Sequence, residues 1–375
     1  MIRVFQTIHK YTPHIPLFEE KYDVTDDMDF ETLRRLVVND GYASTYLLLP
    51  ALEHKADEVF YTIWDYERLQ QCWAREHGLR TRDLSEIKLA QIEEYKPDIF
   101  YNMSAFCDGE FIKRLGKSRV RKDIYWNGII EPEPRTFYEY DGQLSLHRPY
   151  IDYWKRRGLA ACELQPSIPS SWHRRIHANK SIDVLFYGQY FKGMFDNRNG
   201  IIDDLLKYKQ ASRRDIRCHL TYTETRHLQT IFRIPGLPWT HIRRPVISFP
   251  SRNVREQSLP PLYGDTLYGS IAQAKIVVNA YTDDNRDFKS NMRLYEGIGL
   301  GAFLISEEGN YPDGFEPEVD FYTYRNSAEL IHQIERVLAD WPAHAEVAQR
   351  TQRKISALYS KERQWNDFQD FVSSL

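Results

Sequence analysis

The stretch KSNMRLYEGIGLGAFLIS, residues Lys289–Ser306, places three of the chain's 18 glycines beside an arginine and a glutamate. A glycine weakens a helix interior by about 1 kcal/mol relative to alanine, so a helix with Gly297, Gly299 and Gly301 needs a compensating contact. Close packing on a sheet would compensate, and so would the approach of a ligand. The apolar run GAFLIS that follows is typical of a buried strand. The stretch therefore predicts a helix and a strand that lie close together, with room for a ligand.

The start of the predicted helix has the features of an anion site. Ser290 or Asn291 can cap it, and its first turn offers free backbone N–H groups with about half a positive charge. Lys289 and Arg293 add positive charge, which suits a diphosphate. Glu296, one turn later, can accept hydrogen bonds from a vicinal diol such as a ribose. The alternative is an ordinary surface helix with an Arg–Glu pair at i,i+3.

Strand-like and helix-like patterns alternate along the whole chain. The predicted strands are residues 2–8, 57–64, 98–104, 122–128, 181–190, 215–223, 275–281 and 301–306. Such alternation is typical of parallel sheets that are covered on both faces, where ligands bind at the carboxyl ends of the strands. Residues 232–262 are rich in proline and arginine, and we expect them to be irregular.

Dense proline and serine at 163–172 predict a linker between two domains. We therefore expect an α/β fold of two doubly wound units with a cleft between them. The predicted domains are residues 1–170 and 178–355, and a last helix at about 357–375 is expected to return to the first domain.

Composition excludes several classes of protein. The chain has 375 residues and a net charge of −3, which argues against a dedicated nucleic-acid binder. Its four cysteines lie far apart and are expected to be reduced thiols rather than a disulfide framework or a zinc site. No signal peptide or membrane span is evident, so we expect a cytoplasmic protein. The basic run at 113–122 leaves open a peripheral contact with anionic lipid at the inner face of the membrane.

Residues 291–372 resemble the C-terminal part of glycosyl transferases group 1, in the branch that includes the spore-maturation protein CgeB. The resemblance is carried by an N-x-R-x-x-E turn and helix at 291–296, a G-A-x-x-I strand at 301–305 and an F-x-P loop at 315–317. The segments SIDVLFYGQY and NRNGIIDDLL, from residue 181 onward, resemble the first strand, loop and helix of the same domain. Weaker likeness extends back to about residue 90.

The resemblance implies the GT-B fold, in which two Rossmann-like domains face each other. A nucleotide-diphosphate sugar is then expected on the C-terminal domain and an acceptor mainly on the N-terminal one. The resemblance assigns Glu296 to the ribose of the donor, and Tyr222 and Thr223 to its base. It assigns four residues to the diphosphate: Arg293, Lys289, Asn291 and Arg198. Arg198 follows the strand and loop at Gly188. No cofactor or metal is implied, since Arg, Lys and a helix N-terminus can offset the charge of the leaving group.

Two features depart from the family pattern. Many relatives carry a second glutamate eight positions before the ribose-binding one, where this chain has Phe288. The first loop, QTIHKYTPH, contains no glycine, although many GT-B enzymes have a glycine-rich loop there. The contacts of those relatives to the sugar therefore cannot be carried over to this chain.

An inverting transfer needs a general base on the acceptor side. His9, His14, Asp65 and Asp108 follow or lie near predicted strand ends, and Asp108 and His14 are the preferred candidates because of their polar, loop-like surroundings. His173 and His177 have the i,i+4 spacing of a metal pair but lack an acidic or cysteine partner nearby.

The sequence thus predicts a glycosyltransferase that moves a sugar from a nucleotide-diphosphate donor to a hydroxyl of a glycan or lipid-linked glycan, in the synthesis of a surface or secreted glycan. A non-catalytic GT-B-like protein that binds a nucleotide or glycan is one alternative, suggested by Phe288 and the missing loop glycines. A nucleotide-sugar epimerase is the other. The sugar, the base, the stereochemistry and the oligomeric state stay open.

Overall fold

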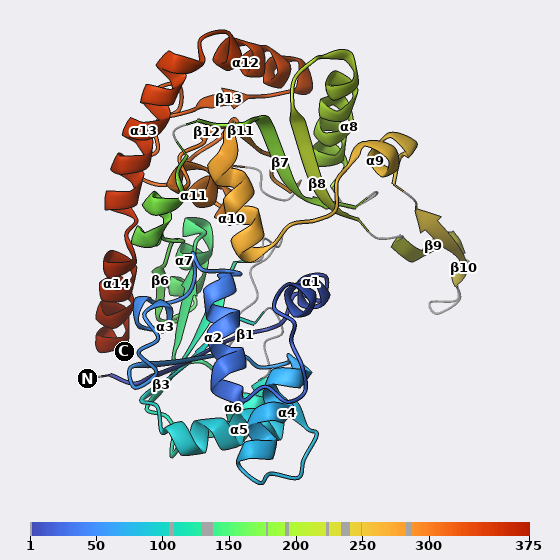
Figure 1. The fold of residues 1–375 in the computed structure, drawn as a ribbon. Coiled ribbons are helices and arrows are strands. Elements are labelled where there is room, and N and C mark those ends of the chain that lie inside the picture. The colour runs from blue at the N-terminus through green and yellow to red at the C-terminus, as the bar shows by residue number, and fades with distance from the viewer. Residues whose placement is uncertain are drawn as a thin grey trace.

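The computed structural model describes residues 2–104, 109–128, 138–177, 179–191, 195–222, 225–233, 241–248, 250–282 and 287–375, with the backbone alone for 225–233 and 241–248. The chain forms two α/β layers, one above the other in Figure 1, and each is built on its own parallel sheet. We call them the N-terminal and the C-terminal domain.

The sheet of the N-terminal domain has the order β2-β1-β3-β4-β5-β6, and every pair of neighbours is parallel. Its strands are β1 (Val4–Ile8), β2 (Val59–Ile63), β3 (Ile99–Asn102), β4 (Lys122–Asn127), β5 (Gly142–Ser145) and β6 (Ala161–Glu163). The helices are α1 (His14–Lys21), α2 (Phe30–Asp40), α3 (Leu49–Leu52), α4 (Glu67–Glu76), α5 (Leu84–Tyr95), α6 (Gly109–Leu115) and α7 (Arg148–Lys155). The four predicted strands of this half are confirmed, whereas the short β5 and β6 were not predicted.

The sheet of the C-terminal domain has the order β13-β12-β11-β7-β8, again with parallel neighbours throughout. Its strands are β7 (Ile182–Tyr190), β8 (Ile216–Tyr222), β11 (Ala274–Asn279), β12 (Phe303–Glu307) and β13 (Tyr322–Tyr324). The helices are α8 (Asp196–Ala211), α9 (Arg252–Gln257), α10 (Gly264–Gln273), α11 (Met292–Gly299), α12 (Ser327–Ala339) and α13 (Trp341–Leu358). The strand that follows β7 in sequence, β8, lies on one side of it, and the later strand β11 lies on its other side. Such a switch point opens a crevice at the carboxyl ends of the strands.

The last helix, α14 (Lys361–Ser374), leaves the C-terminal domain and covers the N-terminal one. Phe368, Phe371 and Val372 join the hydrophobic core that Val4 and Ile99 of the first sheet also form. In Figure 1, α13 and α14 run in succession down one side of both domains. The chain therefore crosses between the domains twice, once before β7 and once between α13 and α14.

One expectation for the connecting regions was wrong. Residues 232–262 are not irregular throughout, because β9 (Thr225–Arg233) and β10 (His241–Ser248) form an antiparallel pair that projects from the body in Figure 1, and α9 follows. A two-stranded ladder has free outer edges, where proline is tolerated. The stretch at 163–172 leads from β6 toward β7, and it is packed against the protein, because Trp172, in the 3₁₀ helix Ser170–Arg175, is buried in a core of the C-terminal domain.

Within the residues described, no helix combines the length and apolar character that crossing a membrane requires.

Candidate functional site

Helix α11 begins as an N-capped helix at the predicted turn. The Asn291 side chain accepts a hydrogen bond from the backbone N–H of Leu294 at 3.1 Å, so Asn291 rather than Ser290 is the cap. Arg293 and Glu296 follow at i,i+3 and both line the same cavity.

The two glycines of α11 and the glycine just after it serve close packing, and the expected room for a ligand at them is not what the structure shows. A Cβ atom added to Gly297 would lie 3.2 Å from a side chain of β12. One added to Gly299 would lie 2.9 Å from Ile168, and one added to Gly301 would lie 2.9 Å from Ile176. Gly301 also has a φ of +75°, which L side chains rarely adopt. These positions therefore carry no side chain where the backbone packs against the sheet and against the chain that joins the two domains.

A cavity of about 240 Å³ lies between the two domains, on the Arg293 side of α11. Tyr11, Tyr42 and Ala43 of the N-terminal domain form one part of its wall. The C-terminal domain supplies the rest: Tyr187, Gly188, Gln189, His219, Thr221, Pro261, Leu262, Tyr263, Gly264, Leu267, Tyr268, Asn291, Met292, Arg293 and Glu296. The structure thus brings together four of the predicted donor residues, Gly188, Asn291, Arg293 and Glu296.

Two buried guanidinium groups meet at Gly188, at the edge of this cavity. Arg293 donates from Nη1 to Oδ1 of Asn279 at 2.9 Å and from Nη2 to the carbonyl of Tyr187 at 2.5 Å. Arg198, on α8, donates from Nη2 to the carbonyl of Gln189 at 2.8 Å. A Cβ atom at Gly188 would lie 2.6 Å from Nη2 of Arg293 and 2.7 Å from Nη2 of Arg198. Glycine is therefore required here for both cations to come this close to the strand end.

Among the described residues no carboxylate pairs directly with either group, and the charges of Glu307 and Glu296 act on Arg198 and Arg293 only from a greater distance. In the part of the chain that the structure describes, neither guanidinium forms an ion pair, and both Nε atoms lack a hydrogen-bond partner. Burial, and next the charge of Arg293, lower the pKa of Arg198 to about 9. Two buried like charges are costly without a counter-charge, and an anion in the cavity would supply one.

Glu296 is the buried acidic group of the cavity. Burial raises the pKa of Glu296 to about 6, while a hydrogen bond from Tyr187 and the charge of Arg293 limit the rise. The Tyr187 hydroxyl donates to Oε2 at 2.8 Å. At neutral pH the carboxylate is ionised and can accept further hydrogen bonds from a ligand.

Two of the predicted donor residues lie elsewhere, and a third falls outside the described residues. Lys289 pairs with Glu307 at 3.2 Å and does not line the cavity, so its charge is offset within the protein. Tyr222 is exposed at the end of β8, and its neighbour Thr221 lines the cavity instead. Thr223 lies outside the described residues.

The two predicted catalytic residues have different outcomes. Asp108 lies outside the described residues. His14 is buried, with Nε2 hydrogen-bonded to Oδ2 of Asp40 at 2.9 Å. Its ring stacks on Tyr42 at 4.5 Å and meets the edge of Tyr263. Since both tyrosines line the cavity and His14 does not, the histidine supports the wall.

The aromatic wall was missed by sequence reasoning. Tyr11 and Tyr263 pack edge to face, and Tyr268 donates across the domains to the carbonyl of Gly41 at 2.7 Å. One signal could have located Tyr42, which follows Gly41, the left-handed residue that ends α2. Tyr11 and Tyr263 come from stretches outside helices and strands, whereas Tyr268 lies within α10.

Comparison with known proteins finds a family match over part of the chain and a fold match over all of it. Residues 213–370 match the model of a family described as glycosyl transferase-like. No curated protein matches the chain. Among solved structures, Anabaena Alr3699/HepE in complex with UDP-glucose has a TM-score of 0.56 at 10% identity, and the alignment covers 100% of both chains. A glycosyltransferase from Rickettsia africae ESF-5 has a TM-score of 0.57 at 8% identity, covering 99% of this chain and 98% of that one.

At such low identity the structural likeness shows the fold, and the CgeB-like branch stays a prediction. The chain has the GT-B fold, with two facing Rossmann-like domains, and its residues 213–370 are similar to the family described as glycosyl transferase-like.

Proposed function

We propose that this protein is a glycosyltransferase that takes a sugar from a nucleotide-diphosphate donor bound in the cavity between its domains. The observation that carries the proposal is the pair of buried guanidiniums of Arg198 and Arg293, which meet at Gly188 without a carboxylate partner among the described residues. The glycosyl transferase-like match at 213–370 supports the same reaction class.

The donor is proposed to lie along the first turns of α11. Its diphosphate accepts hydrogen bonds from Arg293, Arg198 and the N-terminus of the helix, while the ribose hydroxyls donate to Glu296. The base then meets the wall of His219, Thr221 and Tyr263, where aromatic faces suit stacking. HepE has been solved with UDP-glucose and with UDP, so uridine nucleotides are the first probes to use.

Catalysis is proposed to rest on fixed positive charge. When the bond from the sugar to the diphosphate breaks, negative charge grows on the leaving oxygen, and donors already held in place stabilise it without rearrangement. Asn279 and the carbonyls of Tyr187 and Gln189 hold the two guanidiniums. Because the protein supplies these cations, we propose that transfer needs no metal ion, and turnover is expected to persist in EDTA.

The acceptor is proposed to be a hydroxyl of a glycan or lipid-linked glycan that approaches from the N-terminal domain, in the synthesis of a surface or secreted glycan. The basic run at 113–122 is partly neutralised, since Lys117 pairs with Asp123 and Asp141 at 2.5 Å and Arg119 pairs with Glu93. This pairing reduces the charge available to an anionic membrane, so the proposal does not depend on membrane contact.

The function is tested first by calorimetric titration. UDP, GDP and ADP are compared with their nucleosides, and at least one diphosphate should bind far more tightly than its nucleoside, because the nucleoside lacks the groups that the guanidiniums hold. The nucleotide sugar of the same base is then incubated with and without acceptor glycans. Equal binding of nucleoside and diphosphate would refute the site. Release of the diphosphate supports transfer, binding without turnover supports a non-catalytic protein, and conversion of the sugar without acceptor supports an epimerase.

Replacing Gly188 by alanine should weaken diphosphate binding by at least tenfold, because the new Cβ atom takes the space between the two guanidiniums. Its φ of +152° adds backbone strain to the substitution. The matched control is Gly200→Ala on α8, where an added Cβ meets nothing within 4 Å. Calorimetry gives the dissociation constants. Equal binding by both variants would show that the two cations do not hold the diphosphate.

A further inference from the structure

The chain between the domains lies along α11. Residues 164–176, which we call the interdomain segment, join β6 to the approach of β7. Ile168 and Trp172 fill the space left open at Gly299, and Ile176 fills that at Gly301. The helix that carries Arg293 and Glu296 therefore meets the interdomain segment on another side from the cavity.

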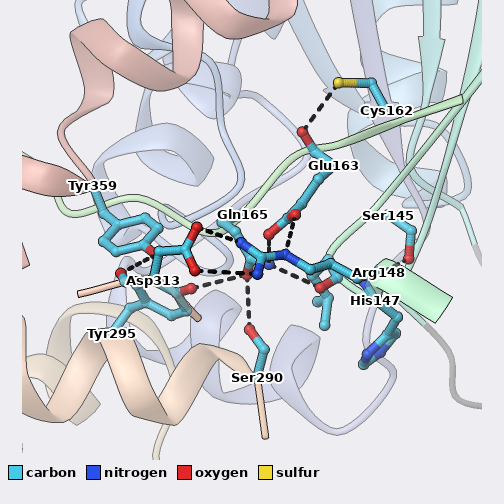
Figure 2. Close-up of polar contacts among 11 residues, drawn as sticks. Ser145, His147, Arg148, Cys162, Glu163, Gln165, Ser290, Tyr295, Asp313 and Tyr359 are labelled. Carbon is cyan, nitrogen blue, oxygen red and sulfur yellow. Dashed lines mark hydrogen bonds and ion pairs between the residues drawn. The ribbon is translucent and has the colours of Figure 1, made fainter. Parts of the chain in front are cut away.

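Gln165, near the start of this segment, makes four side-chain hydrogen bonds. Its Oε1 accepts from the Ser290 hydroxyl and from the Tyr295 hydroxyl, each at 2.8 Å. Its Nε2 donates to the carbonyl of Leu146 at 2.8 Å and to the carboxylate of Glu163 at 2.7 Å. Figure 2 shows the amide at the centre of this cluster, between Glu163 and Ser290. Since a carbonyl and a carboxylate only accept, the orientation of the amide is fixed.

The acceptor side of Gln165 holds the opening of α11. Ser290 immediately precedes the cap residue Asn291, and Tyr295 immediately precedes Glu296. Neither Ser290 nor Tyr295 lines the cavity between the domains. The Gln165 amide is thus hydrogen-bonded to the turn that carries the proposed donor site, through residues that do not line the cavity.

The other contacts of Gln165 lead to the N-terminal domain. Leu146 follows β5, and the backbone carbonyl of Gln165 accepts from Nε2 of Gln364 at 3.0 Å. The same Gln364 amide donates to the carbonyl of Thr45, which also accepts from the backbone N–H of Ser167 at 2.9 Å. Thr45 belongs to the loop whose Tyr42 and Ala43 line the cavity. Gln165 is therefore linked both to α11 and to the loop of the N-terminal domain that lines the cavity.

A charged link crosses the domains beside this amide. Arg148, on α7, donates to both carboxylate oxygens of Asp313, at 3.1 and 2.6 Å, and to Glu163 at 2.7 Å. Figure 2 shows Arg148 between these two acids. Glu163 thus joins the Arg148 pair to the Gln165 amide, and the cluster holds its geometry only when the two domains are close together.

We propose that Gln165 is a positioning residue that couples donor binding at the first turn of α11 to the closed arrangement of the two domains. The inference rests on the proposed function and adds a regulation of that site. A ligand that fixes the turn in the position that Gln165 holds favours closure, and by reciprocity closure favours the ligand. Without the amide, α11 loses its link to Leu146 and Glu163, so donor bound to the C-terminal domain no longer favours closure.

The test uses variants that remove different hydrogen bonds of the Gln165 amide. Gln165→Leu removes the bonds of both Oε1 and Nε2. Gln165→Glu keeps acceptors for Ser290 and Tyr295 but places an oxygen against Leu146 and Glu163. The double variant Ser290→Ala/Tyr295→Phe cuts the α11 side alone. Gln352→Leu is the control, because the Gln352 amide donates to Ser356 within the same helix.

Each of the three cuts is expected to weaken binding of the preferred nucleoside diphosphate about tenfold, within the 5–150-fold range typical of coupled sites. Adding Ser290→Ala/Tyr295→Phe to Gln165→Leu should cause no further loss, because all act on one link. Small-angle scattering should show that the diphosphate makes the wild type and Gln352→Leu more compact, and that this change is lost in the three variants.

Unchanged affinity and unchanged compaction in the Gln165 variants, even with a lower melting temperature, would mean that the amide only supports the fold, and would overturn the inference. Additive losses would overturn it as well. These results leave the proposed function intact, because the wild type still binds. A wild type that binds no nucleoside diphosphate would overturn both.

Discussion

Replacing Arg293 by alanine should reduce transfer about 10²–10³-fold, the effect of removing one preorganised donor worth roughly 2.7–4 kcal/mol of transition-state stabilisation. Arg293 is 9% exposed, and Asn279 and the carbonyls of Tyr187 and Ala280 hold its guanidinium in place before the reaction begins. The measurement is kcat and KM with a competent nucleotide sugar. A fall mainly in kcat shows that the guanidinium acts on the departing diphosphate rather than on the ground state.

Two variants make this result specific. Arg293→Lys keeps the charge but loses the two-pronged geometry, and should recover part of the activity. Arg325→Ala removes an arginine of the same domain that is exposed and paired with Glu329, and should change neither constant. Thermal unfolding of all variants separates lost binding from lost folding. Activity within threefold of wild type in Arg293→Ala would remove the basis of the proposed function.

Replacing Glu296 by glutamine should make the protein more stable at pH 7.5 and less active. The folded pKa of Glu296 is raised from 4.5 to about 6, chiefly by burial. Between these values the folded state binds more protons than the unfolded state, so the free energy of unfolding falls as pH rises. The fall amounts to about 2 kcal/mol, at about 1.4 kcal/mol per pH unit. Glutamine carries no charge at any pH, and its carbonyl can still accept from Tyr187, so this loss should disappear.

The transfer activity of Glu296→Gln should fall although its stability rises. The amide has one acceptor oxygen instead of two and no charge, so a ribose diol is held less strongly, by about 1–2 kcal/mol or roughly tenfold in KM for the donor. Unfolding curves from pH 4.5 to 7.5 measure the first effect and donor kinetics the second. The control is Glu329→Gln, where Arg325 holds the pKa of the carboxyl below its usual range, so no gain in stability is expected. A less stable Glu296→Gln at pH 7.5 would contradict the linkage.

The local features of the site could be predicted from the sequence. Asn291 caps α11 because its side chain reaches an N–H three residues on, and Arg293 and Glu296 share a face because a helix repeats every 3.6 residues. The strands were predicted for the same kind of reason. Unbroken apolar runs such as Ile276–Val278 fit only a strand buried on both faces.

Contacts between distant residues could not be predicted in this way. Lys289 looked available for a phosphate, yet Glu307 pairs with it across 18 positions. The glycines of α11 looked like space for a ligand, whereas Ile168 and Ile176 fill that space. In both cases the deciding partner lies on another segment, and nothing in the local pattern identifies it.

By itself, therefore, the sequence determined the alternation of strands and helices, the cap and charges at the start of α11, and the resemblance to a glycosyltransferase family. Only the tertiary structure decided that Arg198 meets Arg293 at Gly188, that Tyr42 of the other domain lines the same cavity as Arg293, and that Gln165 links both domains. The physical reason is range. Helix periodicity, capping and burial on both faces act over a few residues, whereas counter-charge, desolvation and close packing depend on which distant segments the fold brings together.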